Sequence, residues 1–124
     1  MKLFTLAEAN SLIPTLEPML ESIRDLYAQV ASLRKGARAA AVASEFGGGM
    51  AGGTRYVDAL YRIGKLTTDI SEMGVEMKDY THGLIDFPSM RGDRVVLLCW
   101  QLGEGHKVAW WHELEPGFAG RQPL

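Results

Sequence analysis

The chain has 124 residues, of which 47% are hydrophobic and 23% charged, and its formal net charge is −2. This length and balance predict one globular domain over 1–124, and the lack of a basic stripe argues against a nucleic-acid partner. The single cysteine, Cys99, excludes an internal disulfide, and the longest apolar run, Val95 to Trp100, is far shorter than a membrane span. We therefore expect a cytoplasmic protein that does not bind membranes.

The first predicted element is a long amphipathic helix. Thr5 to Glu8 matches a capping box, which predicts that the helix begins at Leu6. Pro14 and Pro18 each remove a backbone donor, so we expect a kink or a short first segment. The apolar stripe repeats at intervals of three and four residues and comprises Ile13, Leu16, Leu20, Ile23, Tyr27 and Val30.

A second helix is predicted after a glycine-rich connection at 47–53. Thr54 is its expected N-cap, and His82-Gly83 is its expected end. The two helices would form an antiparallel hairpin over 5–82. The second apolar stripe comprises Tyr56, Ala59, Ile63, Leu66, Ile70, Met73, Met77 and Tyr80.

Short apolar runs typical of strands occupy the segment 83–124. Three of them, at 84–90, 94–101 and 107–113, are separated by turn residues. Short turns favour an antiparallel three-stranded meander with the second strand in the centre. Pro88 fits this order, because an edge strand tolerates a missing backbone donor. The predicted fold class is therefore α+β, with a long helical hairpin followed by a β-meander and tail.

The first helix is long for a domain of this size. Residues 14–43 would extend for about 45 Å as a helix, whereas a globule of this length is roughly 35 Å across. Either the helix bends at the prolines and ends early, or a second subunit covers its apolar stripe. We expect a homodimer that buries the helical hairpins.

Three side chains of the predicted sheet could carry chemistry. Asp86 could be a general base, a ligand anchor or an arginine partner, or only a solvated edge residue. His112 could be a general base or a metal ligand, or could simply form hydrogen bonds at a sheet end. Cys99 would need a histidine to activate it, and desolvation on a central strand favours an inert core residue instead. A one-residue change in register decides whether the three share a face.

Four further residues are candidates for ligand binding. Glu104 lies in a Gly-Glu-Gly turn, where it could be solvated or could pin the tail through Arg121. The Arg121 guanidinium could also clamp a carboxylate or phosphate, unless the tail is frayed. Trp100 and Trp111 could stack on a ligand, although core packing is the commoner fate of tryptophan.

A metal centre would need about three or four protein ligands. The available side chains beside His112 are His82, His106, Glu104 and Asp86, and no spacing among them resembles a zinc or iron motif. We therefore expect no metal and no other cofactor.

Several segments together are similar to a known family. They are Phe4-Thr-Leu-Ala-Glu-Ala-Asn10, Gly83-Leu-Ile-Asp-Phe-Pro88, Leu98-Cys-Trp100, Gly103-Glu104, Trp111-His112-Glu113 and Gly117-Phe-Ala-Gly-Arg-Gln-Pro123. Over nearly the whole chain they resemble a bacterial family known as domain of unknown function 2203. The resemblance implies a small bacterial protein with no established activity, and it provides no catalytic residues.

Three functions fit these observations. The first is a non-enzymatic dimeric module whose sheet and tail bind a small ligand or a partner. The second is a small hydrolytic or acid–base enzyme that uses Asp86 and His112, with Cys99 as the less favoured member. Buried polar groups that pair with one another would favour the binding module. A pocket on which Asp86, His112 and Arg121 converge would favour the enzyme. The third function is a helical adaptor protein, which would have no pocket on its sheet.

Overall fold

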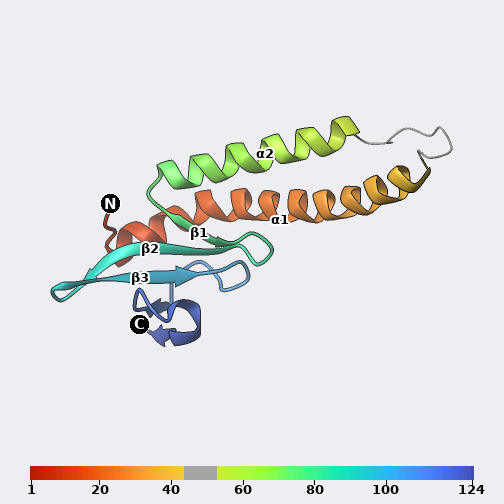
Figure 1. The fold of residues 1–124 in the computed structure, drawn as a ribbon. Coiled ribbons are helices and arrows are strands. Elements are labelled where there is room, and N and C mark those ends of the chain that lie inside the picture. Colours follow the sequence, from red (N-terminus) through yellow and green to blue (C-terminus); the bar gives the residue numbers. More distant parts are fainter. Residues whose placement is uncertain (44–52) are drawn as a thin grey trace.

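A computed structural model describes residues 1–43 and 53–124 (Figure 1). Two helices run side by side as a hairpin, and a twisted antiparallel sheet packs at the end of the molecule where both termini lie. The predicted α+β class is confirmed, whereas the glycine-rich connection lies outside the described residues except for Gly53. The elements are α1 (Leu6–Ala43), α2 (Gly53–Glu72), β1 (Glu76–Asp79), β2 (Leu84–Arg91), β3 (Arg94–Trp100), β4 (Trp110–His112), the short 3-10 helix η2 (Gly117–Gly120) and β5 (Gln122–Pro123).

Helix α1 begins at Leu6, as the capping box predicts. The Thr5 amide donates to Glu8 Oε1 at 3.0 Å, and the Glu8 amide donates to Thr5 Oγ1 at 3.1 Å. The expected short first segment is wrong, because α1 continues through Pro14 and Pro18. Both prolines face solvent, where water can satisfy the freed carbonyls. Each proline destabilises the helix by about 3 kcal/mol. A row of buried apolar side chains, each contributing about 2 kcal/mol, outweighs the cost of both prolines. That row comprises Ile13, Leu16, Leu20, Ile23 and Leu26.

Helix α2 ends at Glu72, ten residues before the predicted end at His82. Gly74 has a φ of +88°, a left-handed conformation that stops a helix and that side chains rarely adopt. The Val75 amide then donates to Ile70 O at 3.4 Å, closing the last turn. Residues 76–79 leave the helix as strand β1. The expected N-cap is also displaced, because α2 begins at Gly53 and Thr54 is already helical.

Helix α2 packs along α1 beyond the sheet, where the buried contact extends as far as Val30. Leu26, Val30 and Ala59 are buried between the two helices, with Tyr56, Ile63 and Leu66 packed around them. Because α2 covers this stretch of the apolar stripe, the length of α1 does not by itself require a second subunit.

The sheet has five strands rather than the predicted three, in the order β1-β2-β3-β4-β5. Every neighbouring pair is antiparallel, so the meander is longer than expected at both ends. Strand β1 comes from the segment predicted as the end of the second helix, and β5 comes from the tail. Strand β3 is central, as predicted, whereas β4 is only three residues long.

Pro88 lies on a locally open stretch of β2 and not on an edge strand. Strand β1 pairs only with residues 84–86. Beyond them, the Phe4 amide donates to Pro88 O at 2.7 Å, and Ser89 Oγ donates to Phe4 O at 2.5 Å. The N–H and C=O of one strand residue point to the same side, so the donor missing from Pro88 faces Phe4 and leaves the ladder with β3 intact.

The two faces of the sheet meet different partners. The inner face packs on α1 and the N-terminal segment, and there the ring of Phe4 contacts Phe87 edge-on at 5.3 Å between centroids. The buried residues of this inner face are Ile85, Phe87, Val96, Leu98, Trp100 and Trp111. The alternate residues of the same strands therefore point to the outer face, away from the helices.

Candidate functional site

Asp86, Cys99 and His112 share the outer face of the sheet. Asp86 on β2 lies directly opposite Cys99 on β3. His112 on β4 lies opposite Leu97, which is two residues from Cys99 and therefore on the same face. The register that the sequence left open thus brings together the three candidates of the sheet.

The outer face is nevertheless closed off from solvent at these residues. Asp86 and His112 are each 2% exposed and Cys99 is 0% exposed. The tail that follows β4 folds back over them and leaves a cavity of about 300 Å³. Its lining comprises Lys78, Leu84, Asp86, Leu97, His112, Leu114, Gly117 and Phe118. A polar floor thus lies beneath largely apolar walls.

The hydrogen bonds of His112 place one shared proton between His112 and Asp86. His112 Nδ1 lies 2.6 Å from the backbone oxygen of Glu113, which only accepts, so Nδ1 must carry a proton. His112 Nε2 lies 3.0 Å from Asp86 Oδ1. That short contact needs a second proton, held either by Nε2 as an imidazolium or by a protonated Asp86. The pair is therefore a buried proton-sharing unit at the floor of the cavity.

Burial governs the ionisation of the two acids in this cluster. Desolvation raises the pKa of Asp86, and the neighbouring His112 opposes that change. Burial, followed by the adjacent Asp86 carboxylate, raises the pKa of the Cys99 thiol to about 12. The thiol is therefore protonated at neutral pH, which disfavours Cys99 as an unassisted nucleophile.

Arg121 and Glu104 form an ion pair that holds the tail against the sheet. Arg121 Nη1 donates to Glu104 Oε2 at 2.8 Å, and Nη2 donates to Oε1 at 2.7 Å. The Gln101 amide donates to the same carboxylate at 2.8 Å. Burial on its own would raise the pKa of Glu104, but the hydrogen bonds from Arg121 and Gln101 hold it below its usual value. The guanidinium also lies over the rings of Trp110 and Phe118.

Arg121 does not converge on Asp86 and His112. Of the three cluster residues it contacts Cys99, to whose backbone oxygen Nη2 donates at 3.4 Å. The Arg121 guanidinium is paired with Glu104 and thereby holds the tail in place over the cavity.

The two tryptophans proposed for ligand stacking lie on the inner face. Trp100 is fully buried in the core, where its indole N–H donates to Gly105 O at 3.2 Å. Trp111 is 5% exposed, and the guanidinium of Arg91 covers its ring at 4.1 Å. Both side chains are therefore separated by the sheet from Asp86 and His112.

Residues that sequence reasoning missed complete the cavity. Lys78 had been assigned to the second helix, but β1 places it on the outer face. Leu114 and Phe118 belong to the tail. The alternation of polar and apolar residues directly after Gly74 is the signal that could have located Lys78, whereas no local pattern marks the residues of the tail.

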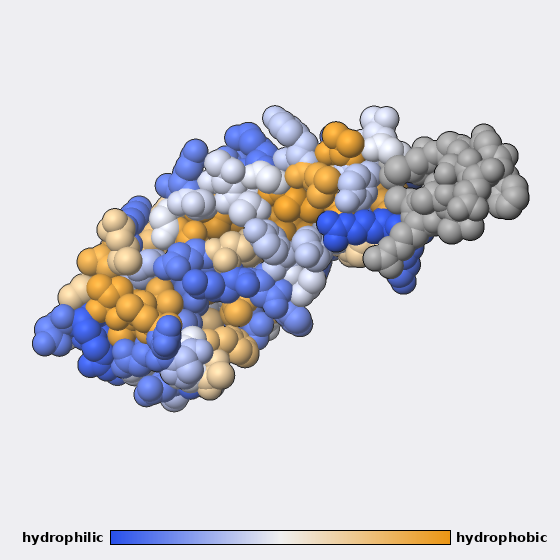
Figure 2. Space-filling model, viewed as in Figure 1, coloured by the Kyte–Doolittle hydropathy of each residue, from blue (hydrophilic) through white to orange (hydrophobic). Residues whose placement is uncertain are grey.

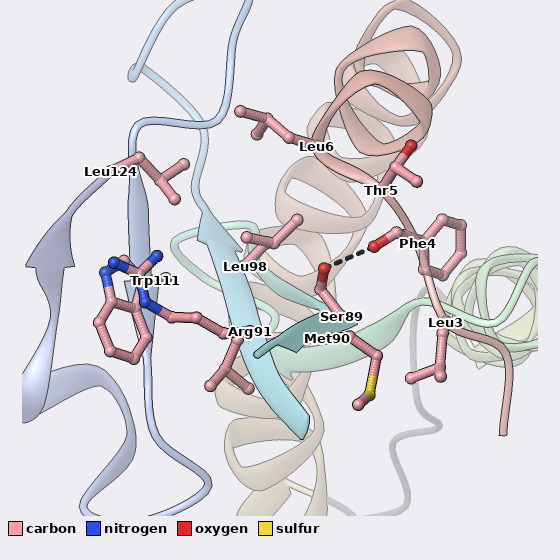
Figure 3. A pocket seen from close by; sticks show the side chains of 11 residues that line it. Leu3, Phe4, Thr5, Leu6, Ser89, Met90, Arg91, Leu98, Trp111 and Leu124 are labelled. Carbon is pink, nitrogen blue, oxygen red and sulfur yellow. Dashed lines mark hydrogen bonds between the residues drawn. The ribbon is translucent and has the colours of Figure 1, made fainter. Parts of the chain in front are cut away.

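A second hollow, of about 430 Å³, lies between the N-terminal segment, the β2–β3 hairpin and the C-terminus (Figure 3). Its walls include Leu6, Leu98 and Leu124. The polar groups there are already engaged, because Ser89 donates to Phe4 O and Arg91 lies over Trp111. The hollow holds no acid–base pair, so the groups able to do chemistry gather at the other cavity.

Fold and site together define a small α+β protein with a five-stranded meander, a helical hairpin and a polar cluster covered by its own tail. The chain belongs to the family described as an uncharacterized conserved protein, DUF2203, whose model matches residues 2–124. Comparison with curated proteins and with solved structures yields no match. Neither α1 nor α2, within the residues described, combines the length and the apolar content needed to cross a bilayer.

Proposed function

We propose that the protein is a binding module for a small organic acid, with its site in the cavity beneath the tail. The proposal rests on one observation, the placing of the Asp86–His112 pair at the floor of a largely apolar cavity. A volume of about 300 Å³ is at the small end of ligand sites, so the ligand is small.

The lining indicates the chemistry of that ligand. Leu114 and Phe118 offer apolar surface, which suits a short hydrocarbon or aromatic body. Lys78 brings a positive charge to the same cavity, and its partner Glu76 lies 3.1 Å away at an exposed position, where such pairs are weak. A ligand carboxylate could therefore replace Glu76 as the partner of Lys78, while the proton shared by Asp86 and His112 stays between those two side chains at the cavity floor.

The test is a panel of small aliphatic and aromatic carboxylic acids added to the isotope-labelled protein in the presence of a chelator. We expect amide shifts confined to the segments that line the cavity, in β1, β2, β3, β4 and the tail through η2, and a loss of binding in Lys78→Ala and Phe118→Ala. Lys65→Ala and Leu124→Ala are matched controls, because Lys65 is an exposed ion-paired lysine and Leu124 a half-exposed apolar residue outside the cavity. Shifts that cluster elsewhere, or the absence of binding by every acid, would refute the proposal.

The proposed module is a homodimer assembled through the outer side of α2. Val57 is 66% exposed, Leu60 41% and Tyr61 71%, and this spacing places them on one side of the helix. Apolar surface over α2 is visible in Figure 2. A neighbouring copy of the same strip would bury these side chains in a symmetric contact.

A second candidate function is a small acid–base or hydrolytic enzyme. The observation that favours it is the shared proton of Asp86 and His112, a pair able to donate and accept at the cavity floor. The raised pKa of Cys99 leaves that residue a lesser candidate. The enzyme would hydrolyse small ester substrates, and the rate should fall at least about 100-fold in His112→Gln. If the rate of this variant equals that of the wild-type protein, the enzymatic function is excluded.

A further inference from the structure

The Asp86–Cys99–His112 cluster has the composition and spacing of a metal site. A carboxylate oxygen, a thiol sulfur and an imidazole nitrogen lie within 4.8 Å of one another. The ligands of a tetrahedral zinc ion lie about 3.5 Å apart, so a small shift of side chains would bring all three to bonding distance. They come from β2, β3 and β4, three adjacent strands that hold their relative positions.

His112 is already oriented as a metal-binding histidine is. Its Nδ1–H donates to Glu113 O at 2.6 Å, and such a bond to a backbone carbonyl fixes the tautomer that leaves Nε2 as an acceptor. Nε2 then faces Asp86 Oδ1 at 3.0 Å. Two acceptors this close together require a cation between them, and a proton or a metal ion fulfils that requirement.

The three donor types select among metals. Ca²⁺ and Mg²⁺ prefer sites made of oxygen ligands, whereas a thiolate and an imidazole suit Zn²⁺ and chemically similar ions. Three protein ligands leave a fourth tetrahedral position for water or a ligand. Asp86 and His112 both line the cavity, so that position would face the cavity.

We propose that Asp86, Cys99 and His112 bind one zinc-class divalent cation, with its fourth coordination position open to the cavity beneath the tail. Binding replaces protons with the metal. The thiol proton of Cys99 and the proton shared by Asp86 and His112 pass to solvent as Sγ, Oδ and Nε2 become ligands. The inference deepens the proposed binding function and rests on it for the role of the cavity, because an acid in the cavity would occupy the fourth position.

The experiment is a titration of the reduced, metal-free protein with Co²⁺, which reports its ligands by absorption. We expect saturation at one ion per chain, a thiolate-to-cobalt charge-transfer band, the intense d–d bands of a tetrahedral site, and displacement by Zn²⁺. Because the sequence holds one cysteine, that charge-transfer band reports on Cys99 alone.

Matched variants identify the ligands. Cys99→Ser should abolish the charge-transfer band, and Asp86→Asn and His112→Gln should each weaken Co²⁺ binding more than about 100-fold. His82→Gln is the control, because His82 is a histidine paired with an aspartate, Asp79, at an exposed position. Circular dichroism verifies that each metal-free variant is folded. If His112→Gln does not fold, Cys99→Ser and Asp86→Asn still decide the question.

Two results would overturn the inference: a folded wild-type protein that shows no charge-transfer band with Co²⁺, or Asp86→Asn that binds Co²⁺ as tightly as wild type. Its failure is distinguishable from that of the proposed function. If carboxylic acids bind in the presence of chelator but the protein does not bind Co²⁺, only the metal-site proposal is refuted. If the protein binds Co²⁺ but none of the acids, only the proposed binding of a small acid is refuted.

Discussion

Arg121, in the C-terminal tail, forms two parallel hydrogen bonds with the carboxylate of Glu104, in the turn that follows β3. The side chains are 12% and 18% exposed, so this pair is shielded from solvent more than a typical surface ion pair. Through it, the segment that covers Asp86 and His112 is attached to the turn that follows the central strand of the sheet.

Removal of the Glu104 charge should loosen the tail. We expect Glu104→Gln to lower the free energy of unfolding by about 2 kcal/mol, because hydrogen bonds to charged groups are lost and Arg121 stays partly buried. Chemical denaturation measures the change. Glu115→Gln, an exposed carboxylate of the same tail, is the control and should have almost no effect. Equal stabilities of the two variants would show that the ion pair does not hold the tail.

Acid should weaken the same contact. The folded-state pKa of Glu104 lies below its usual value of 4.5, so its contribution is fully present above pH 4.5 and is lost as the pH falls through the folded-state pKa. Unfolding curves of wild type and Glu104→Gln, compared at neutral pH and below pH 4, measure this loss. The stability gap between the two proteins should narrow in acid, and a gap that is constant with pH would contradict the assignment.

Cys99 should be inert in the native, metal-free protein. It is fully buried and burial raises the pKa of its thiol to about 12, so neither access nor thiolate is available at neutral pH. Labelling with a disulfide reagent should be slow in buffer and rapid in denaturant. Native labelling as fast as that of a free thiol would mean that the tail opens freely.

Two glycines of the hairpin region should respond to alanine in opposite directions. Gly74 has a φ of +88°, and a Cβ there would lie 2.9 Å from the Cβ of Lys2, so Gly74→Ala should destabilise by at least about 1 kcal/mol. Gly64 lies within α2 with open space around it, so Gly64→Ala should stabilise by about 1 kcal/mol. Thermal unfolding of the pair measures both, and shifts of the same sign would argue against the termination of α2 at Gly74.

The proposed dimer depends on the outer side of α2. Tyr61→Glu should convert it to a monomer, because a charge would be buried in the apolar contact. Light scattering of the wild-type protein should give twice 13.7 kDa, and Leu3→Glu, a half-exposed residue at the sheet end, is the control. A wild-type mass of 13.7 kDa would disprove the dimer.

The local signals of the sequence predicted most of the secondary structure. The capping box at Thr5 located the start of α1, because its two hydrogen bonds join residues only three positions apart. The end of α2 was missed because Met77 and Tyr80 happen to continue the helical spacing beyond Gly74. Strand β5 was missed because two residues of tail carry no periodic pattern and pair only with a strand already in place.

Sequence alone established two amphipathic helices, a central apolar strand and Asp86, Cys99 and His112 as the candidates for chemistry. Only the tertiary structure decided that these three meet, since pairing register places residues from separate strands on one face. It also decided that the tail buries them and that Trp100 and Trp111 belong to the core. Periodicity reports which side of an element is apolar, whereas contacts between distant segments depend on how the elements pack.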